Sequence, residues 1–252
     1  MAPSSAPVLS RSAAFARPAV PTVRAAPQLP RLLPLLDPEH FGDVAFYRAL
    51  AAMGYRQVLL GGTGSTHLPA LVAALRRQTA LQIVVYPCGP EAVCAADLIL
   101  LPDIMNSSAA HARPFGSGAV RTAMAVARTG CPWLPVAHFI QADSTACDYY
   151  DAEPVHDAQA LLRQCTYARM VGYRHIALDY EGAAARLPCA LARRLAQAVP
   201  SAWLTVSDEV CPARAQALLA SGVDTVVVPS DLFEQAADPL ALAHAYFVRL
   251  LA

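Results

Sequence analysis

The chain has 252 residues, of which 56% are apolar, and its 19 basic and 19 acidic residues give a formal net charge of zero. A chain of this length can bury one large core, and without a long basic run it is not expected to bind nucleic acid. Proline, glycine or charge interrupts every apolar stretch before about 18 residues, so we expect no membrane-spanning helix. The composition therefore predicts one domain with a small-molecule partner.

The first 30 residues differ in composition from the rest. Residues 1–30 are rich in Ala, Pro, Ser and Arg and contain no acidic residue. We interpret them as a disordered tail rather than a secretory signal, because they lack an unbroken apolar segment, and assign residues 31–252 to the folded domain. Seven cysteines without a Cys-x-x-Cys pair indicate reduced thiols, which favours a cytoplasmic location.

From Arg31 onward, strand-like runs alternate with amphipathic segments, as in repeated βα units around a parallel sheet. Eight strands are predicted, at Leu32–Leu36, Gln57–Leu60, Gln82–Tyr86, Leu98–Leu101, Leu134–Ile140, His175–Leu178, Trp203–Val206 and Thr225–Val228. Helices are predicted between and after them, at Val44–Met53, Leu68–Gln78, Val120–Ala127, Ala158–Val171, Cys189–Ala198, Pro212–Ser221 and Pro239–Leu251.

The third crossover differs from the others. Cys88–Ala96 is too short for an outer helix, which predicts a loop or a single turn there. Gly54, Gly172 and Gly222 each stand between a predicted helix and the next strand, where a left-handed residue ends a helix. The pattern predicts a single TIM-like (β/α)8 barrel with a shortened or missing third outer helix; an open doubly wound sheet is the alternative.

In such barrels the catalytic groups lie at the C-terminal ends of the strands. Those positions are rich in carboxylates, hydroxyls and glycines: Asp37; Gly61, Gly62, Thr63, Gly64 and Ser65; Asn106 and Ser107; Asp179 and Glu181; Ser207 and Asp208; and Ser230. Oxygen ligands of this kind suit Mg2+, which binds one or two carboxylates together with substrate phosphates. Simpler interpretations stay open: Asp37 before Pro38 could cap a helix, and the glycine-rich segment could be a tight turn.

The order and spacing of four motifs resemble the geranylgeranylglyceryl phosphate synthase family, which includes the heptaprenylglyceryl phosphate synthases and the moenomycin-type farnesyl phosphoglycerate transferases. The motifs are Leu36-Asp37-Pro38, Gly61-Gly62-Thr63-Gly64, Ala96–Ser107 and Phe115-Gly116. The resemblance implies a TIM-like barrel and a homodimer. It also implies a reaction in which an acceptor hydroxyl attacks the first carbon of a prenyl diphosphate, with Mg2+, to form an ether.

The resemblance also assigns roles to individual residues. Asp37 matches the family's magnesium-binding aspartate and Thr63 its hydroxyl ligand, while Asn106 and Ser107 match a pair that lines the active site. Asp179 stands where the family has a glutamate, so it could act as the general base, with Glu181 as a substitute. A turn-forming role for Asn106 and Ser107, and a turn cap for Asp179, are the alternatives.

This chain departs from the family where the family binds the acceptor's phosphate. Three glycine-containing cradles of the family are replaced by Glu181-Gly182-Ala183, Ser207-Asp208-Glu209 and Pro229-Ser230. Because the carboxylates of Asp208 and Glu209 would repel a phosphate, the acceptor is not expected to be glycerol 1-phosphate.

Three functions remain for such a barrel. The first is a prenyltransferase that acts on another hydroxyl acceptor. The second is a terpene synthase-like diphosphate lyase or cyclase that uses the same donor site, and the third is a non-catalytic prenyl-lipid-binding barrel. Phe115, Trp133, Phe139, Tyr149 and Tyr150 are candidates for an apolar tract around the prenyl chain, with ordinary core packing as the alternative. Peripheral contact with a membrane surface stays open.

Overall fold

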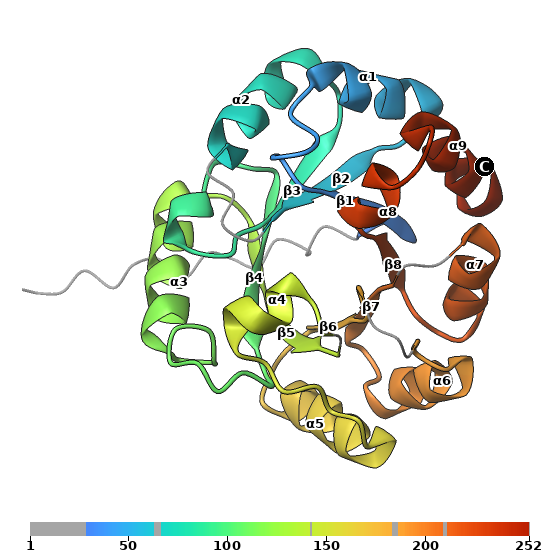
Figure 1. Cartoon of the computed structure of the whole chain (residues 1–252). Helices are drawn as coiled ribbons and strands as arrows, with labels where there is room; N and C mark the ends of the chain where they lie inside the picture. Colours follow the sequence, from blue (N-terminus) through green and yellow to red (C-terminus); the bar gives the residue numbers. More distant parts are fainter. Residues whose placement is uncertain (1–28, 63–66, 142, 183–185, 209–210, 252) are drawn as a thin grey trace, which may run out of the picture.

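A computed structural model describes residues 29–62, 67–141, 143–182, 186–208 and 211–251. Eight parallel strands form a closed barrel in which each strand pairs with the next and the last returns to the first (Figure 1). Leu32 pairs with Val226 across the closing seam. The predicted TIM-like barrel is therefore confirmed, and the closed seam excludes the open doubly wound sheet.

The strands are β1 (Leu32–Leu36), β2 (Gln57–Gly61), β3 (Gln82–Tyr86), β4 (Leu98–Ile104), β5 (Trp133–Ile140), β6 (His175–Asp179), β7 (Trp203–Ser207) and β8 (Thr225–Val228). The helices are α1 (Val44–Met53), α2 (Leu68–Gln78), α3 (Ser117–Thr129), α4 (Thr145–Tyr150), α5 (Ala158–Met170), α6 (Cys189–Ala198), α7 (Pro212–Ala220), α8 (Ser230–Glu234) and α9 (Pro239–Leu250). All eight strands and seven of these helices match predicted elements within a few residues.

The third crossover has the predicted short form. Between β3 and β4 the described chain forms a single 3-10 turn, η1 (Pro90–Ala92), in place of an outer helix. Three glycines end helices in the left-handed conformation as predicted, with φ of 105° at Gly54, 115° at Gly172 and 98° at Gly222. The sequence missed α4 and α8, two short helices that lie inside the ring of outer helices in Figure 1.

Strand β4 runs three residues further than predicted, although Pro102 lacks a backbone N–H. The N–H groups of Ile99 and Met105 donate to the side of β5, so the missing donor of Pro102 falls on the opposite side, toward β3. The β3–β4 pairing has already ended at Ile99, whereas the β4–β5 pairing continues to Ile104. The proline therefore removes no bond from the ladder.

Alternating strand residues form two apolar layers. One layer fills the inside of the barrel, and the other packs between the barrel and the helices. Leu29, which precedes β1, is buried in the inner layer, and the carbonyl of Pro30 accepts a hydrogen bond from Thr225. The barrel domain therefore includes residues 29 and 30, which the sequence assigned to the tail; residues 1–28 lie outside the described part of the chain.

Candidate active site

Asp37 and Gly62 meet at the C-terminal mouth of the barrel, after β1 and β2. A methyl group built on Gly62 would lie 2.4 Å from Oδ2, 2.5 Å from Cγ and 2.6 Å from Oδ1 of Asp37. Only a residue without a side chain lets the two segments approach so closely. The structure thus brings these two predicted site residues together; Thr63, Gly64 and Ser65 lie outside the described residues.

The Asp37 carboxylate is half-buried. Its Oδ1 accepts the Glu39 N–H at 2.9 Å. Burial raises the pKa of this carboxyl above its usual value, while the Glu39 N–H and nearby His40 act in the opposite direction. Asp37 does not cap α1, because the side chain of Asp43 accepts the Ala45 N–H at the start of that helix. The helix-cap alternative is therefore wrong, and Asp37 caps only the turn that follows β1.

Ser230, at the first position of α8, fixes the backbone of Asp37. Its Oγ accepts the Asp37 N–H at 3.2 Å and donates to Oε1 of Glu234 at 2.5 Å. Glu234 also lies 3.7 Å from Nε2 of His40. The predicted site residue Ser230 thus holds the metal candidate in place across the seam between β1 and β8.

The donors around Asp37 fit a cation that brings its own oxygen ligands. Among the described residues, no group of three or more His, Cys, Asp or Glu side chains is placed to hold a metal ion. Mg2+ commonly uses one or two carboxylates and completes its shell with substrate phosphates and water. A single, partly desolvated carboxylate backed by a glycine has the chemistry to hold Mg2+ bound to a diphosphate.

On the other side of the mouth, Asp179 ends β6 and faces His138 of β5. Both side chains are buried, and Nε2 of His138 lies 3.6 Å from Oδ2 of Asp179. The other carboxylate oxygen, Oδ1, accepts the N–H of Glu181 at 2.9 Å. The structure therefore places Asp179 and the backbone of Glu181 together, and it adds a histidine that the sequence did not single out.

Polar atoms without partners gather around this pair. Within the described residues, Oη of Tyr86, Nδ1 of His138 and Oγ of Ser207 line one cavity with Asp179 and are buried without a hydrogen bond. The rings of Tyr86 and His138 meet edge to face at 5.5 Å. Buried polar groups normally find partners, so this concentration indicates a site prepared for a polar ligand or water.

Asn106 and Ser107 hold the ends of β4 and β5 together. Asn106 donates to the carbonyls of Ile140 at 2.6 Å and Glu153 at 2.9 Å, and its Oδ1 accepts the Ile140 N–H at 3.1 Å. Ser107 donates from Oγ to the carbonyl of Tyr150. These bonds favour the turn-forming alternative for both residues, since the side-chain amide of Asn106 is hydrogen-bonded to the main chain.

The surroundings of Asp208 differ from what the sequence led us to expect. Its side chain is fully buried after β7, and Oδ1 lies 2.5 Å from Nη1 of Arg186, which comes from the segment after β6. The guanidinium balances the carboxylate charge, so the expected repulsion of a phosphate by Asp208 is wrong. Glu209 and Ala183 lie outside the described residues. A distant partner such as Arg186 leaves no signal in the local motif.

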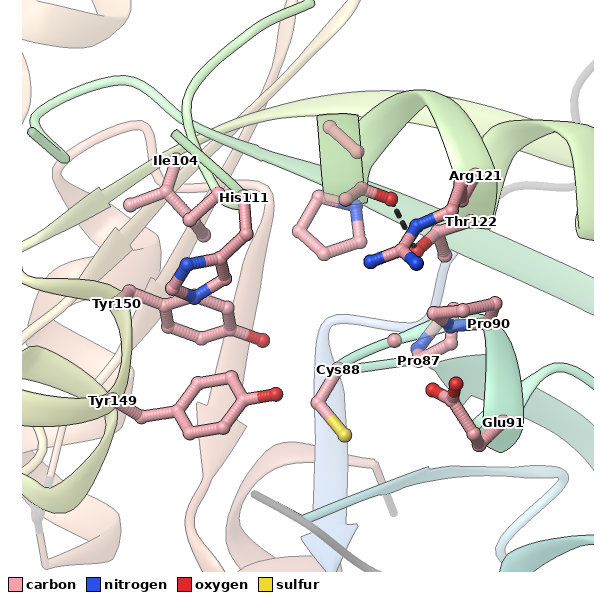
Figure 2. Close-up of a pocket in the computed structure, with 15 residues that line it drawn as sticks. Pro87, Cys88, Pro90, Glu91, Ile104, His111, Arg121, Thr122, Tyr149 and Tyr150 are labelled. Atoms are coloured by element: carbon pink, nitrogen blue, oxygen red, sulfur yellow. Dashed lines mark hydrogen bonds between the residues drawn. The ribbon is translucent and has the colours of Figure 1, made fainter. Parts of the chain in front are cut away.

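A cavity opens beside the short third crossover. It measures about 260 Å3 and lies among η1, the segment between β4 and α3, the first turns of α3, and α4. Figure 2 shows Tyr149, Tyr150 and His111 on one side of it and Arg121, Thr122 and Glu91 on the other. The rings of Tyr149 and Tyr150 pack edge to face at 4.8 Å. The missing outer helix thus leaves an aromatic-walled opening.

The other aromatic candidates for a prenyl-binding tract lie elsewhere. Phe115 is 92% exposed, Trp133 begins β5 at the opposite end of the barrel from the mouth, and Phe139 is buried in the layer between barrel and helices. Tyr149 and Tyr150 are therefore the members of that group that line the cavity.

These features define the class: a TIM barrel whose polar strand-end residues gather at the C-terminal mouth. By sequence, no protein-family model and no curated protein matches the chain. By structure, it is similar to (S)-3-O-geranylgeranylglyceryl phosphate synthase from Thermoplasma acidophilum, solved with sn-glycerol-1-phosphate, with a TM-score of 0.75, 18% identity, and coverage of 88% of this chain and 93% of that one.

Two further structures set the scale of this similarity. The enzyme of the same kind from Thermoplasma volcanium gives a TM-score of 0.73 at 18% identity, covering 87% of this chain and 91% of that one. A 3-hexulose-6-phosphate synthase from Salmonella typhimurium reaches 0.56 at 15% identity, covering 88% and 98%. The resemblance predicted from the motifs is thus confirmed at the level of the fold.

None of the described helices combines the length and hydropathy needed to cross a membrane. The predicted homodimer, the cytoplasmic location and any membrane-surface contact stay predictions.

Proposed function

We propose that the chain is a Mg2+-dependent prenyltransferase that moves an isoprenoid chain from a prenyl diphosphate to a hydroxyl acceptor. The observation that carries this proposal is the Asp37–Gly62 contact opposite the buried Asp179 at the same end of one barrel. The fold shared with geranylgeranylglyceryl phosphate synthases supports the same reaction class.

Asp37 and Thr63 would hold the metal, with the amides of the glycine-rich segment beside it. When bound, Mg2+ would stabilise the negative charge that develops on the departing diphosphate. The half-buried position of Asp37 supports this role, because a carboxylate with few water contacts gains more from a bound cation. Ser230 keeps the Asp37 backbone fixed while the donor exchanges.

The cavity beside η1 is our candidate for the prenyl chain. Tyr149 and Tyr150 offer ring faces and edges to an apolar chain and to positive charge developing at its first carbon. Burial, followed by the electrostatic influence of Tyr150 and then of Asp179, raises the pKa of the Tyr86 phenol well above its ordinary value. Tyr86 therefore interacts electrostatically with both the cavity-lining Tyr150 and Asp179.

For the acceptor, we propose a hydroxyl compound other than plain glycerol 1-phosphate. The glycines that form phosphate cradles in the resembling family are replaced here after the sixth, seventh and eighth strands. The segment after β7 places a buried, paired Asp208 where a phosphate cradle would need exposed amides.

The test is a transfer assay with the full chain. Geranyl, farnesyl and geranylgeranyl diphosphates are supplied with Mg2+, each with glycerol 1-phosphate, with unphosphorylated alcohols, with cell extract, or with no acceptor. Diphosphate release and extracted products are both measured. We expect release that depends on Mg2+ and on an acceptor, and a loss of about 100-fold in Asp37→Asn. Asp43→Asn, which changes the cap of α1 in the same loop, is the matched control.

Each contrary result points to a different function. Release without an acceptor favours the diphosphate lyase or cyclase. Tight donor binding with no turnover favours the non-catalytic barrel. A preference for glycerol 1-phosphate over every other alcohol overturns the acceptor proposal and leaves the transferase intact.

A further inference from the structure

We propose that the general base of this site is the His138–Asp179 pair, in which His138 takes the acceptor's proton at Nδ1 while Asp179 holds the opposite ring N–H. This inference rests on the proposed function and deepens it, because the sequence pointed to Asp179 alone. Its starting point is the contact between Nε2 of His138 and Oδ2 of Asp179 at 3.6 Å, deep in the mouth.

The contact fixes which ring nitrogen carries the proton. An ionised carboxylate only accepts hydrogen bonds, so the nitrogen that faces Asp179 is the one that donates. Nδ1 of His138 then carries the lone pair, and it is buried with no hydrogen-bond partner among the described residues. At 3.6 Å the contact is longer than a hydrogen bond, as is common for catalytic pairs before substrate binds.

Asp179 is better placed to orient a base than to be one. Its Oδ1 already accepts the Glu181 N–H at 2.9 Å, and its Oδ2 faces the imidazole. Both oxygens therefore have a neighbour that donates a proton toward them. Histidine is also the side chain that most often serves as a general base.

The surroundings of His138 leave room for a hydroxyl. Its ring lines a central cavity of about 60 Å3 together with Tyr86, Asp179 and Ser207. A cavity needs at least about 10–15 Å3 of such space to hold one water, so this one admits a hydroxyl group or a few waters that carry its proton. The unpartnered Oη of Tyr86 and Oγ of Ser207 supply hydrogen bonds to that oxygen.

Three titratable residues besides Asp179 line the cavity next to His138: Tyr86, His175 and Glu181. Tyr86 of β3 stays protonated, because burial raises the pKa of its phenol. His175 lies deeper on β6, and burial, followed by the nearby His138, lowers its pKa to about 3, so it stays neutral. His175 lies 2.6 Å from Oγ1 of Thr205, which occupies its Nε2. The Asp179 carboxylate, 3.6 Å from Nε2, is the charged group that the structure pairs with the His138 ring.

The proposed step balances. The acceptor oxygen forms a bond to the first prenyl carbon as the bond from that carbon to the diphosphate oxygen breaks, and the diphosphate leaves with the electron pair. The hydroxyl proton passes to Nδ1 of His138. The resulting imidazolium is neutralised by Asp179, as in other acid–histidine pairs.

The decisive variant is His138→Gln, whose side-chain amide can still donate to Asp179 but cannot accept a proton. We expect kcat to fall about 100-fold, KM for the donor to change less than about threefold, and the acidic limb of the kcat profile against pH to vanish. Asp179→Asn should also lower kcat, and the double variant should cost little more than His138→Gln alone. His175→Gln, a buried histidine one layer deeper, should lower the melting temperature yet keep the shape of the pH profile.

Two results overturn the inference. One is a His138→Gln enzyme with wild-type kcat and an intact acidic limb while Asp179→Asn is inactive, which would make Asp179 the base by itself. The other comes from long-range 1H–15N spectra of the wild-type protein, which need no activity. The Nε2–H tautomer of His138 is expected, and the Nδ1–H tautomer refutes the pair. If the wild type turns over no donor, the proposed function fails and the tautomer alone decides this inference.

Discussion

Replacing Gly62 with alanine should push the Asp37 carboxylate out of its position. The added methyl group would lie 2.4–2.6 Å from three carboxylate atoms, whereas real contacts of this kind are essentially never under 3.0 Å. The backbone of β1 and β2 is fixed by pairing of Leu36 with Leu60, so the side chain of Asp37 has to rotate. Rotation removes the acceptor of the Glu39 N–H.

The expected cost follows from these contacts. Losing the Glu39 bond costs about 0.5–1.5 kcal/mol, and an off-rotamer side chain costs about as much again. Alanine also restricts the unfolded chain more than glycine does, which raises the free energy of unfolding by about 0.4–1 kcal/mol. We therefore expect Gly62→Ala to lose about 1–2 kcal/mol, which lowers the melting temperature by roughly 2–8 °C in a domain of this size. Mg2+-dependent diphosphate release should fall as far as in Asp37→Asn.

The matched control is Gly42→Ala in the loop that follows Asp37. Its added methyl group would meet the Pro38 carbonyl at 3.4 Å, which is ordinary contact, so stability should change by less than about 0.5 kcal/mol. Thermal unfolding and diphosphate release are measured on both variants. A Gly62→Ala protein that melts and responds to Mg2+ like the wild type would refute the placement of the Asp37 carboxylate against Gly62.

Three further outcomes are expected. Because the pKa of Asp37 is raised in the folded state, its contribution to stability is present below the unfolded value of 3.8 and is lost as pH rises through the folded value. Without metal, Asp37→Asn should therefore gain stability relative to wild type between pH 3 and pH 7 in urea unfolding. A difference that stays constant with pH would contradict this. Asn106→Ala leaves the N–H and C=O groups of Ile140 without their hydrogen-bond partner and should lower the free energy of unfolding by about 2–3 kcal/mol in the same assay. An unchanged unfolding midpoint would be the contrary result. Arg186→Met leaves the buried Asp208 carboxylate without its guanidinium and should cost about 3 kcal/mol, much of it restored by adding Asp208→Asn; no restoration would mean that Arg186 acts by packing.

The sequence predicted the frame of this molecule because each strand and most helices carry local signals. Three glycines mark helix ends, and the length between β3 and β4 excludes a full helix. The short helices α4 and α8 were missed because five or six residues give no periodic pattern. Ser144, whose Oγ accepts the Cys147 N–H, is the cap signal that would have located α4.

The site could be predicted only where its parts follow strand ends. Asp37, Gly62 and Asp179 were found this way, whereas His138 lies within an apolar strand and was not singled out. Val136 and His138 lie on the same face of β5 and point into the barrel, so a polar residue at an inward position near the end of a strand was the available signal. Arg186 carries no such signal, because its pairing with Asp208 depends on how two loops meet in space.

The hydrogen bond from the Asp37 N–H to Ser230 joins residues 193 positions apart in the chain. During synthesis, nearly the whole polypeptide must therefore be made before the backbone of Asp37 can form this contact. A nascent or C-terminally shortened chain that lacks α8 would carry Asp37 and Gly62 yet hold them loosely. This end of the barrel would then reach its final arrangement only once the last strand closes the ring.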